Sequence, residues 1–156
     1  MSKKSNRNKS SVLPGNGRLR CHCGSHVVLR DADEVCAVHR EGAKAYVCAR
    51  YPVCDSYVMA HPGTLEPMGS LAGPELRRLR YEAHRQFNKI YECGLMSKQE
   101  AYRWLAGVVQ APMRHAHIGH LNDYYCREVI RKSRELLEKR GLRNASEMRG
   151  ERRATA

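Results

Sequence analysis

Residues 21–54 open with Cys21-His22-Cys23-Gly24 and close with Cys48-Ala49-Arg50-Tyr51-Pro52-Val53-Cys54. Zinc prefers four soft or borderline ligands in a tetrahedron, and thiolates supply them. Gly24 suits a tight turn after the first pair, because glycine accepts positive φ angles. The chain has an odd number of cysteines, seven, and in a reducing compartment paired spacings favour metal over disulfides. The stretch therefore predicts a structural Zn²⁺ site with the ligands Cys21, Cys23, Cys48 and Cys54.

The first cysteine pair is irregular. Zinc knuckles usually have Cys-x-x-Cys, whereas this pair is Cys-x-Cys, and Arg20 stands where the missing ligand would fall. Cys21 can reach the ion through a distorted turn. His26, or Cys36 together with His39, can take its place. The sequence leaves the first ligand open between Cys21 and these side chains.

Composition limits the class of protein and its partners. The 156 residues allow one ordinary domain or two small ones, and the formal net charge is +12. No apolar run approaches the length of a membrane span, and no apolar signal region is present near residue 1, so we expect a cytoplasmic protein with no membrane partner. A strongly basic chain favours a polyanionic partner, here nucleic acid, with DNA preferred to RNA. No motif indicates a small-molecule substrate.

Changes in composition divide the chain into five segments. They are a disordered basic tail over 1–18, the zinc ribbon over 19–60, a linker over 61–73, a three-helix domain over 74–141 and a basic C-terminal tail over 142–156. Short strands are expected at 26–31, 35–39, 44–49 and 57–59. The expected fold class is α+β: a small antiparallel sheet forming the ribbon, followed by a three-helix unit.

Helix start and stop signals define the three helices. Pro74 suits the first position of a helix that Gly94 ends. Ser97 with Glu100 forms a capping box that opens the second helix. Asn122 caps the third helix, and we expect Gly141 to end it.

Basic side chains on the helices and in the first tail are candidates for phosphate contact, because the planar guanidinium of arginine binds two phosphate oxygens. Tyrosines in the ribbon can stack on unpaired bases or fill its small core. The candidate nucleic-acid residues are Lys3, Lys4, Arg7 and Lys9 in the tail, Tyr51 in the ribbon, Arg78, Arg85 and Lys89 on the first helix, and Arg127, Arg131 and Arg134 on the third.

Catalysis is not expected. Four cysteines would close the zinc site and leave no open position for a substrate. His61 and the histidines at 115, 117 and 120 could form a second site, but no carboxylate set or nucleophile–base pair accompanies them. They are interpreted as packing, capping or solvent-exposed residues.

Two resemblances to known families add to these predictions. Cys23-Gly24, Val28-Leu29-Arg30, Tyr46-Val47-Cys48 and Tyr51-Pro52-x-Cys54 resemble the C-terminal zinc ribbons of bacterial type IA topoisomerases, which bind single-stranded DNA. Residues 19–136 are similar to a family of small phage and prophage proteins described as zinc-finger-containing. The segments that carry this similarity are the ribbon, His61-Pro62-Gly63-Thr64, Ser70-Leu71-Ala72, Glu75-Leu76-Arg77, Met96-Ser97-Lys98, Glu100-Ala101-Tyr102, Trp104-Leu105 and His117-Ile118-Gly119. The resemblance implies zinc and nucleic acid but no biochemical activity.

The sequence thus predicts a phage-encoded zinc-ribbon protein that binds nucleic acid through basic faces. One alternative is an effector that binds a host protein of the transcription or replication machinery. A second alternative is a metal-dependent nuclease that uses His61 and the histidine loop.

Overall fold

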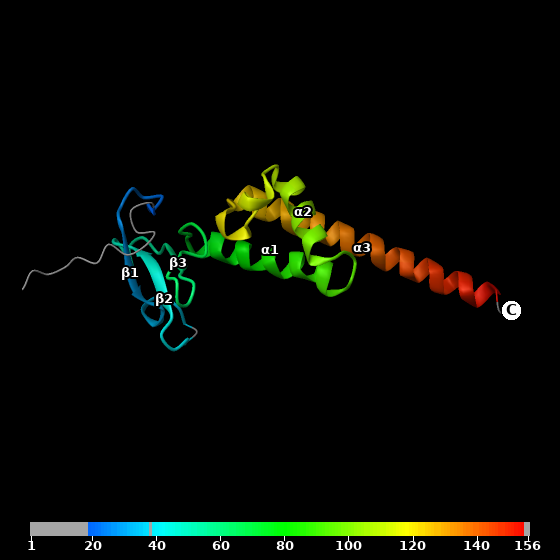
Figure 1. Cartoon of the computed structure of the whole chain (residues 1–156), viewed down its shortest axis with the longest axis horizontal. Helices are drawn as coiled ribbons and strands as arrows, with labels where there is room; N and C mark the ends of the chain where they lie inside the picture. The colour runs from blue at the N-terminus through cyan, green and yellow to red at the C-terminus, as the bar shows by residue number, and fades with distance from the viewer. Residues whose placement is uncertain (1–18, 38, 155–156) are drawn as a thin grey trace, which may run out of the picture. The chain divides into compact units, whose positions relative to one another are not determined.

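The computed structural model describes residues 19–37 and 39–154, with side chains as far as Gly141. The basic tail with Lys3, Lys4, Arg7 and Lys9 therefore lies outside the described residues. The chain divides into two compact units between Leu71 and Ala72. The first unit holds the sheet and the second holds the long helices (Figure 1).

The first unit is a three-stranded antiparallel sheet with the order β1-β2-β3, formed by β1 (Val27–Asp31), β2 (Lys44–Cys48) and β3 (Tyr57–Met59). Leu29 pairs with Tyr46, and Tyr46 pairs with Val58, so these three side chains share one face. That face packs with Leu71 into a small core cluster. Tyr46 is fully buried there and donates a hydrogen bond to the carbonyl of Leu65 at 2.7 Å. This tyrosine fills the core rather than offering a stacking surface.

The strand expected at 35–39 is wrong for the described residues of that range, 35–37 and 39, none of which is in a strand. A short 3-10 helix, η1 (Ala32–Glu34), follows β1, and the backbone N–H of Cys36 donates to the carbonyl of Ala32 at 2.8 Å. The chain therefore satisfies its hydrogen bonds locally on the way to β2. Because β1 pairs directly with β2 over its whole length, no place between them is left for another strand.

The second unit contains α1 (Pro74–Glu92), α2 (Lys98–Val109) and α3 (Asp123–Ala154), with short 3-10 turns η2 (Met113–His115) and η3 (Ile118–His120) before α3. Pro74 opens α1, and the Ser97–Glu100 capping box opens α2, as the sequence predicts. The side chain of Asn122 accepts a hydrogen bond from the N–H of Tyr125 at 3.0 Å, which caps α3. None of the helices in the described part of the chain combines the length and apolar character needed to cross a bilayer.

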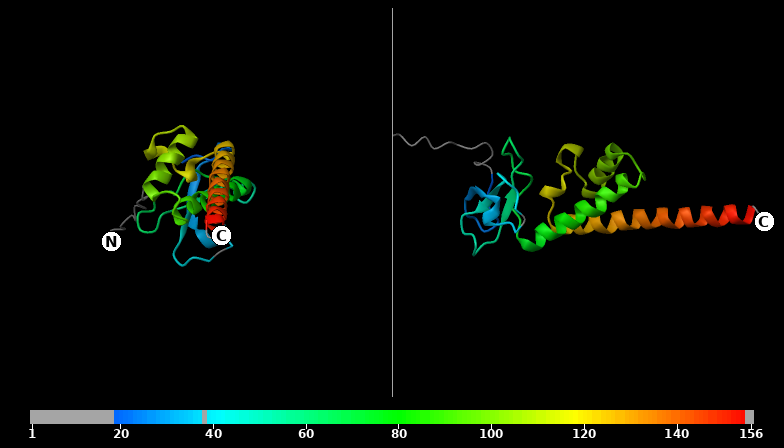
Figure 2. Two further views of the ribbon diagram at one scale, coloured as in Figure 1. Left: turned by 90° about the vertical axis from the view of Figure 1, so that its right-hand side faces the viewer. Right: turned by 90° about the horizontal axis from the view of Figure 1, so that it is seen from below.

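Helices α1 and α3 run parallel and lie side by side (Figures 1 and 2). Glu75 pairs with Arg127 at 3.3 Å, and one heptad later Glu82 pairs with Arg134 at 2.9 Å. Both pairs have the same sequence separation, 52 residues. A constant offset repeated after seven residues is the geometry of interhelical ion pairs in parallel coiled coils. Both helices contribute to the buried apolar core of this unit, with Leu79, Ala83 and Ile90 from α1 and Cys126, Val129 and Ile130 from α3.

Helix α3 does not end where the sequence predicts. It continues through Gly141 to Ala154, past the ends of the other two helices (Figure 2). Gly94, after α1, has φ of +73°, whereas Gly141 does not have a positive φ. A glycine stops a helix when it takes the left-handed conformation, and Gly141 remains helical at a modest cost in propensity.

Candidate metal centre

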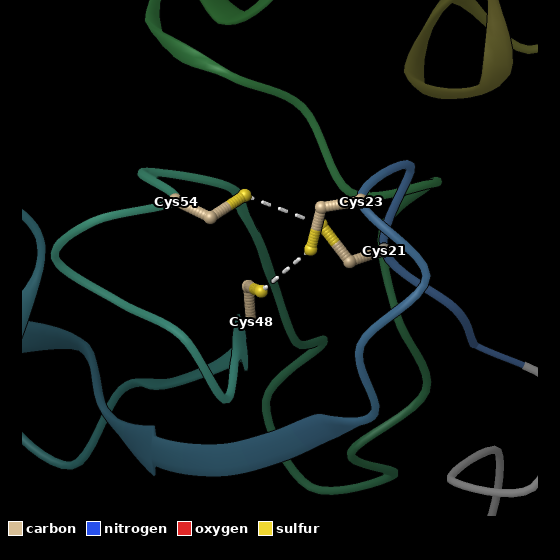
Figure 3. Close-up of side chains that lie close together, drawn as sticks. All are labelled: Cys21, Cys23, Cys48 and Cys54. Atoms are coloured by element: carbon tan, nitrogen blue, oxygen red, sulfur yellow. Dashed lines mark hydrogen bonds between the residues drawn. The ribbon is translucent and has the colours of Figure 1, made fainter.

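The side chains of Cys21, Cys23, Cys48 and Cys54 turn toward one another (Figure 3). Their four sulfur atoms lie within 4.8 Å of one another. The Cys21–Cys54 and Cys23–Cys48 sulfur pairs are each 3.5 Å apart. Four thiolates about 2.3 Å from one zinc ion would lie about 3.8 Å apart at the corners of a tetrahedron. The spacing of the sulfurs matches a four-thiolate metal site.

The first knuckle precedes β1 and folds back on itself. The N–H of Gly24 donates to the carbonyl of Cys21 at 2.9 Å, and the N–H of Cys21 donates to the carbonyl of Ser25 at 3.2 Å. Gly24 has φ of +85°, a conformation that a side chain would strain. This closed turn brings both sulfurs of the Cys-x-Cys pair to the same side.

The second knuckle begins at Cys48, the last residue of β2. The N–H of Tyr51 donates to the carbonyl of Cys48 at 2.9 Å, and the N–H of Cys54 donates to the carbonyl of Arg50 at 3.1 Å. These turns return the chain to the cluster and lead into β3. The sheet thus holds one ligand directly and positions the other three through short loops.

The alternative ligands His26, Cys36 and His39 are not part of the cluster. Among the described residues, the four cysteines form the one group of three or more side chains close enough to share an ion. His39 instead contacts the carboxylate of Asp33 at 2.7 Å. The structure therefore brings Cys21 to the cluster despite the short spacing.

Two of the thiols differ widely in pKa, Cys23 and Cys48. Hydrogen bonds from the side chain and backbone N–H of Ser25 lower the pKa of Cys23 to about 6. Burial raises the pKa of Cys48 to about 12. A thiolate at Cys48 therefore needs a nearby positive charge, which a bound cation supplies.

Sequence reasoning missed three side chains around the cluster. The hydroxyl of Ser56 lies 3.6 Å from the sulfur of Cys54 and 3.4 Å from Nδ1 of His22. The same His22 nitrogen is 3.7 Å from the sulfur of Cys21. Ser25, His22 and Ser56 are each within two residues of a ligand, which is the signal that could have identified them. Such neighbours orient ligands and tune a metal site.

The predicted nucleic-acid residues do not form one free basic face. Tyr51 is half-buried and packs with the apolar cluster on the face of the sheet opposite Tyr46. Arg78 and Lys89 are exposed. The remaining four arginines are ion-paired: Arg85 and Arg134 with Glu82, Arg127 with Glu75, and Arg131 with Glu128 and Glu135.

The histidine loop is partly structural. Ile118 is buried in the core of the second unit, whereas His115, His117 and His120, which are close to it in the sequence, are exposed. Burial and the nearby guanidinium of Arg80 lower the pKa of His120. His61 is exposed in the first unit.

Comparison with known proteins agrees with the cysteine geometry. Residues 18–136 match the family described as zinc-finger-containing domain, and this match covers more than half of the chain. No curated protein and no solved structure matches the sequence. The matched range includes all four cysteines and the three helices as far as Leu136. The chain belongs to the family of zinc-finger-containing domain proteins.

Proposed function

We propose that the metal is zinc and that its role is structural. The single observation that carries this is a donor set made only of four cysteine sulfurs within 4.8 Å of one another. Thiolates favour zinc over calcium and magnesium, which take oxygen ligands. Four protein ligands fill a tetrahedron, so no position remains for a substrate or an attacking water. We accordingly propose no catalytic role for the chain.

The nucleic-acid partner is the second part of the proposal. Charge is distributed unevenly: residues 19–71 contain five Lys and Arg against six Asp and Glu, whereas residues 72–156 contain eighteen against ten. Residues 1–18 add five basic residues and no acidic one. The helical unit and the tail, rather than the ribbon, thus carry the excess positive charge that attracts phosphates. Resemblance to phage and prophage proteins extends the proposal to a phage-encoded protein that acts in a bacterial cytoplasm on DNA in preference to RNA.

The existing ion pairs indicate which candidate cations are most available to bind a phosphate. Arg127, Arg131 and Arg134 each contact a glutamate, whose charge competes with a phosphate. On α1, neither Arg78 nor Lys89 has an ion pair within the described residues. Phosphate binding therefore costs less on α1, because a paired arginine must first give up part of its existing contact.

A salt titration tests this proposal. Each phosphate neutralised lowers the logarithmic salt slope of binding by roughly 0.9 on duplex DNA and about 0.7 on a single strand. Changing Arg78, Arg85 and Lys89 together to Gln should flatten the slope by about 2 units. Changing Arg127, Arg131 and Arg134 to Gln should flatten the slope less. Changing the four basic residues of the tail to Gln should flatten it by about 3 units; these are Lys3, Lys4, Arg7 and Lys9.

The matched control is Arg20, Arg40 and Arg50 changed to Gln. It removes the same number of charges from exposed positions of the ribbon and should leave the slope nearly unchanged. Short labelled duplex DNA, single-stranded DNA and RNA of equal length are compared. Failure of the wild-type protein to bind any of them at low salt would refute the nucleic-acid proposal. Retention of one host protein after nuclease treatment would then support the effector alternative, and metal-dependent plasmid cleavage would support the nuclease alternative.

A further inference from the structure

Tyr81, on the surface of α1, is the most exposed aromatic side chain in the described part of the chain, at 71%. The other exposed tyrosine, Tyr124, is 61% exposed, and its ring contacts that of Tyr125 at 5.2 Å between centroids. Within the described residues, the ring of Tyr81 has no such aromatic partner. Most of this ring is therefore accessible to a flat group from outside the chain.

The side chains around Tyr81 on α1 are basic. Arg78 precedes it by three residues and Arg85 follows it by four, so the three side chains share one side of the helix. Lys89 continues this side one turn beyond Arg85. Between positions 78 and 89 the exposed residues are Arg78, Tyr81, His84, Arg85 and Lys89. The exposed set thus has three cations and no carboxylate around one accessible ring.

The acidic residue within this range, Glu82, is less exposed, and its Oε1 atom contacts Arg134 of α3 at 2.9 Å. Its Oε2 atom accepts from Nε of Arg85 at 2.9 Å and lies 2.9 Å from Nη2 of the same guanidinium. A guanidinium has five N–H donors, and in the part of the chain that the structure describes Nη1 of Arg85 has no partner. Arg85 can therefore contact a phosphate through Nη1 while it stays paired with Glu82.

We propose that Tyr81 stacks on an unpaired base of a single-stranded nucleic acid, while Arg78, Arg85 and Lys89 contact its phosphates. This inference rests on the proposed nucleic-acid binding and adds the form of nucleic acid that this side of α1 recognises. Every base has a flat π-face, so an aromatic ring among cations binds single strands with little sequence preference. In a duplex each base is paired and stacked between its neighbours, and its face is not open to a side chain on a helix surface.

The spacing along α1 fits this arrangement. Arg78 lies about 4.5 Å before Tyr81 along the helix axis, and Arg85 lies about 6 Å after it. Both side chains are long, so their guanidinium groups reach phosphates on the two sides of one stacked nucleotide, where each planar fork binds two oxygens. Tyrosine has only two side-chain torsions to fix, so stacking on it has a low entropic cost.

Removing the ring tests the stacking, with fluorescence anisotropy of labelled strands as the readout. Tyr81→Ala should weaken binding to a short single strand of thymidine nucleotides by about 5- to 150-fold, the effect of one lost base–aromatic stack. Binding to a duplex of equal length should be nearly unchanged. The salt slope should stay the same on both, since no charge is lost. Tyr81→Phe keeps the ring and should bind like wild type.

An abasic strand gives the sharper test, because it has the same phosphates as the thymidine strand and lacks the bases. Wild type should bind the abasic strand more weakly than the thymidine strand. Tyr81→Ala should show a much smaller difference between the two strands. The four affinities form a double-mutant cycle, whose coupling isolates the contact between the ring and a base from the phosphate contacts.

The matched control is Tyr124→Ala, which removes the other exposed tyrosine ring, on α3, where Arg127 and Arg131 are ion-paired with glutamates. It should leave the affinity for the single strand nearly unchanged. Alanine favours a helix at an exposed position, and circular dichroism establishes that every variant keeps the helical fold.

The outcomes separate this inference from the proposed function. If wild type binds the strands with salt-dependent affinity but Tyr81→Ala binds the single strand equally well, stacking is overturned and nucleic-acid binding stands. An equal loss on single strand and duplex, or no coupling in the cycle, would overturn stacking as well. If wild type binds none of the strands even at low salt, both the proposed function and this inference fail.

Discussion

The short Cys21–Cys23 spacing is compatible with the cluster because the following residues close the knuckle. Gly24 supplies a positive φ, and the Cys21–Ser25 backbone hydrogen bond folds the chain back at 3.2 Å. Ser25 then donates to the sulfur of Cys23 and lowers the pKa of that thiol. The sequence predicts that the four cysteines form one metal site. It cannot separate Cys21 from His26 as the first ligand, because that choice depends on the closed turn.

Tyr46 and the ion-paired arginines show a second limit at the residue scale. Alternation along β2 indicates that Tyr46 lies on one face of the sheet, but only the fold decides that Leu65 covers that face and accepts its hydroxyl hydrogen bond. Likewise, the spacing of Arg127 and Arg134 indicates one side of α3. Their glutamate partners are 52 residues away on α1, and nothing local in the sequence identifies them.

At the element scale, parallel packing of α1 on α3 depends on matched polar and apolar positions. The Glu82 carboxylate is the most connected group in this pair, since it accepts hydrogen bonds from Arg85, Gln86 and Arg134. These contacts, with Arg85 and Gln86 contributing most, lower the pKa of Glu82 to about 2. Of the three contacts, the one from Arg134 joins α3 to α1, whereas Arg85 and Gln86 lie on α1 and hold the carboxylate in place for it.

The pH dependence of the helical unit tests this role. A carboxyl whose pKa is lowered in the folded state stabilises the fold above its unfolded pKa of about 4.3, and the benefit disappears as pH falls toward 2. Glu82→Gln should therefore lower stability by about 1 kcal/mol at pH 7, with little difference from wild type near pH 2. Thermal unfolding at both pH values is the measurement. Glu92→Gln, on an exposed position at the end of α1, is the control, and an equal effect of the two changes at pH 7 would contradict this role.

Glycine substitutions test where the helices end. Because Gly141 lies inside α3 and nothing lies within 4 Å of an added Cβ atom, Gly141→Ala should stabilise the helix by up to about 1 kcal/mol. Gly94 has φ of +73°, so Gly94→Ala should destabilise the unit by about 1 to 2 kcal/mol. Far-ultraviolet circular dichroism and thermal melts compare the two. Destabilisation by Gly141→Ala would mean that this glycine ends the helix after all.

Helix starts are predictable from the sequence here, and the last helix end is not. Caps at Ser97 and Asn122 are local hydrogen bonds between neighbouring residues, so the sequence contains all of their partners. Whether a glycine ends a helix depends on its φ angle. Gly94 has a positive φ and follows the end of α1, whereas Gly141 does not have a positive φ and α3 continues through it. The strand expected at 35–39 was misassigned for a similar reason, because the local sequence does not show which strands pair. Val35 and Cys36 are apolar, but they follow the 3-10 helix η1 on the connection between β1 and β2, which pair directly with each other.

At the scale of the whole molecule, two units have separate sources of stability. The apolar cluster of the helical unit draws its buried members from Leu79 through Ile130, whereas the ribbon has only small clusters around its sheet. A domain with so little buried apolar surface usually needs a metal or another cross-link. We therefore expect that the ribbon needs the bound metal to fold and that the helical unit does not.

Removing the metal should unfold the ribbon and leave the helical unit folded. Structural zinc supplies apparent binding energy on the order of 10 kcal/mol at neutral pH, so a strong chelator or Cys48→Ser should unfold the ribbon. Helical circular dichroism should persist, while amide exchange in β1 and β2 becomes fast. Cys93→Ser is the matched control, because Cys93 is exposed and outside the cluster. Loss of the helices together with the ribbon would contradict separate stabilisation.

Zinc X-ray absorption of the purified protein is the decisive measurement for a single zinc ion held by Cys21, Cys23, Cys48 and Cys54. We expect one zinc per chain with four sulfur neighbours at about 2.3 Å. The same spectrum is expected when Cys36, Cys93 and Cys126 are all changed to Ala, since none of them belongs to the cluster. Absence of zinc, a nitrogen neighbour at about 2.0 Å, or loss of metal in the triple variant would contradict the four-cysteine site.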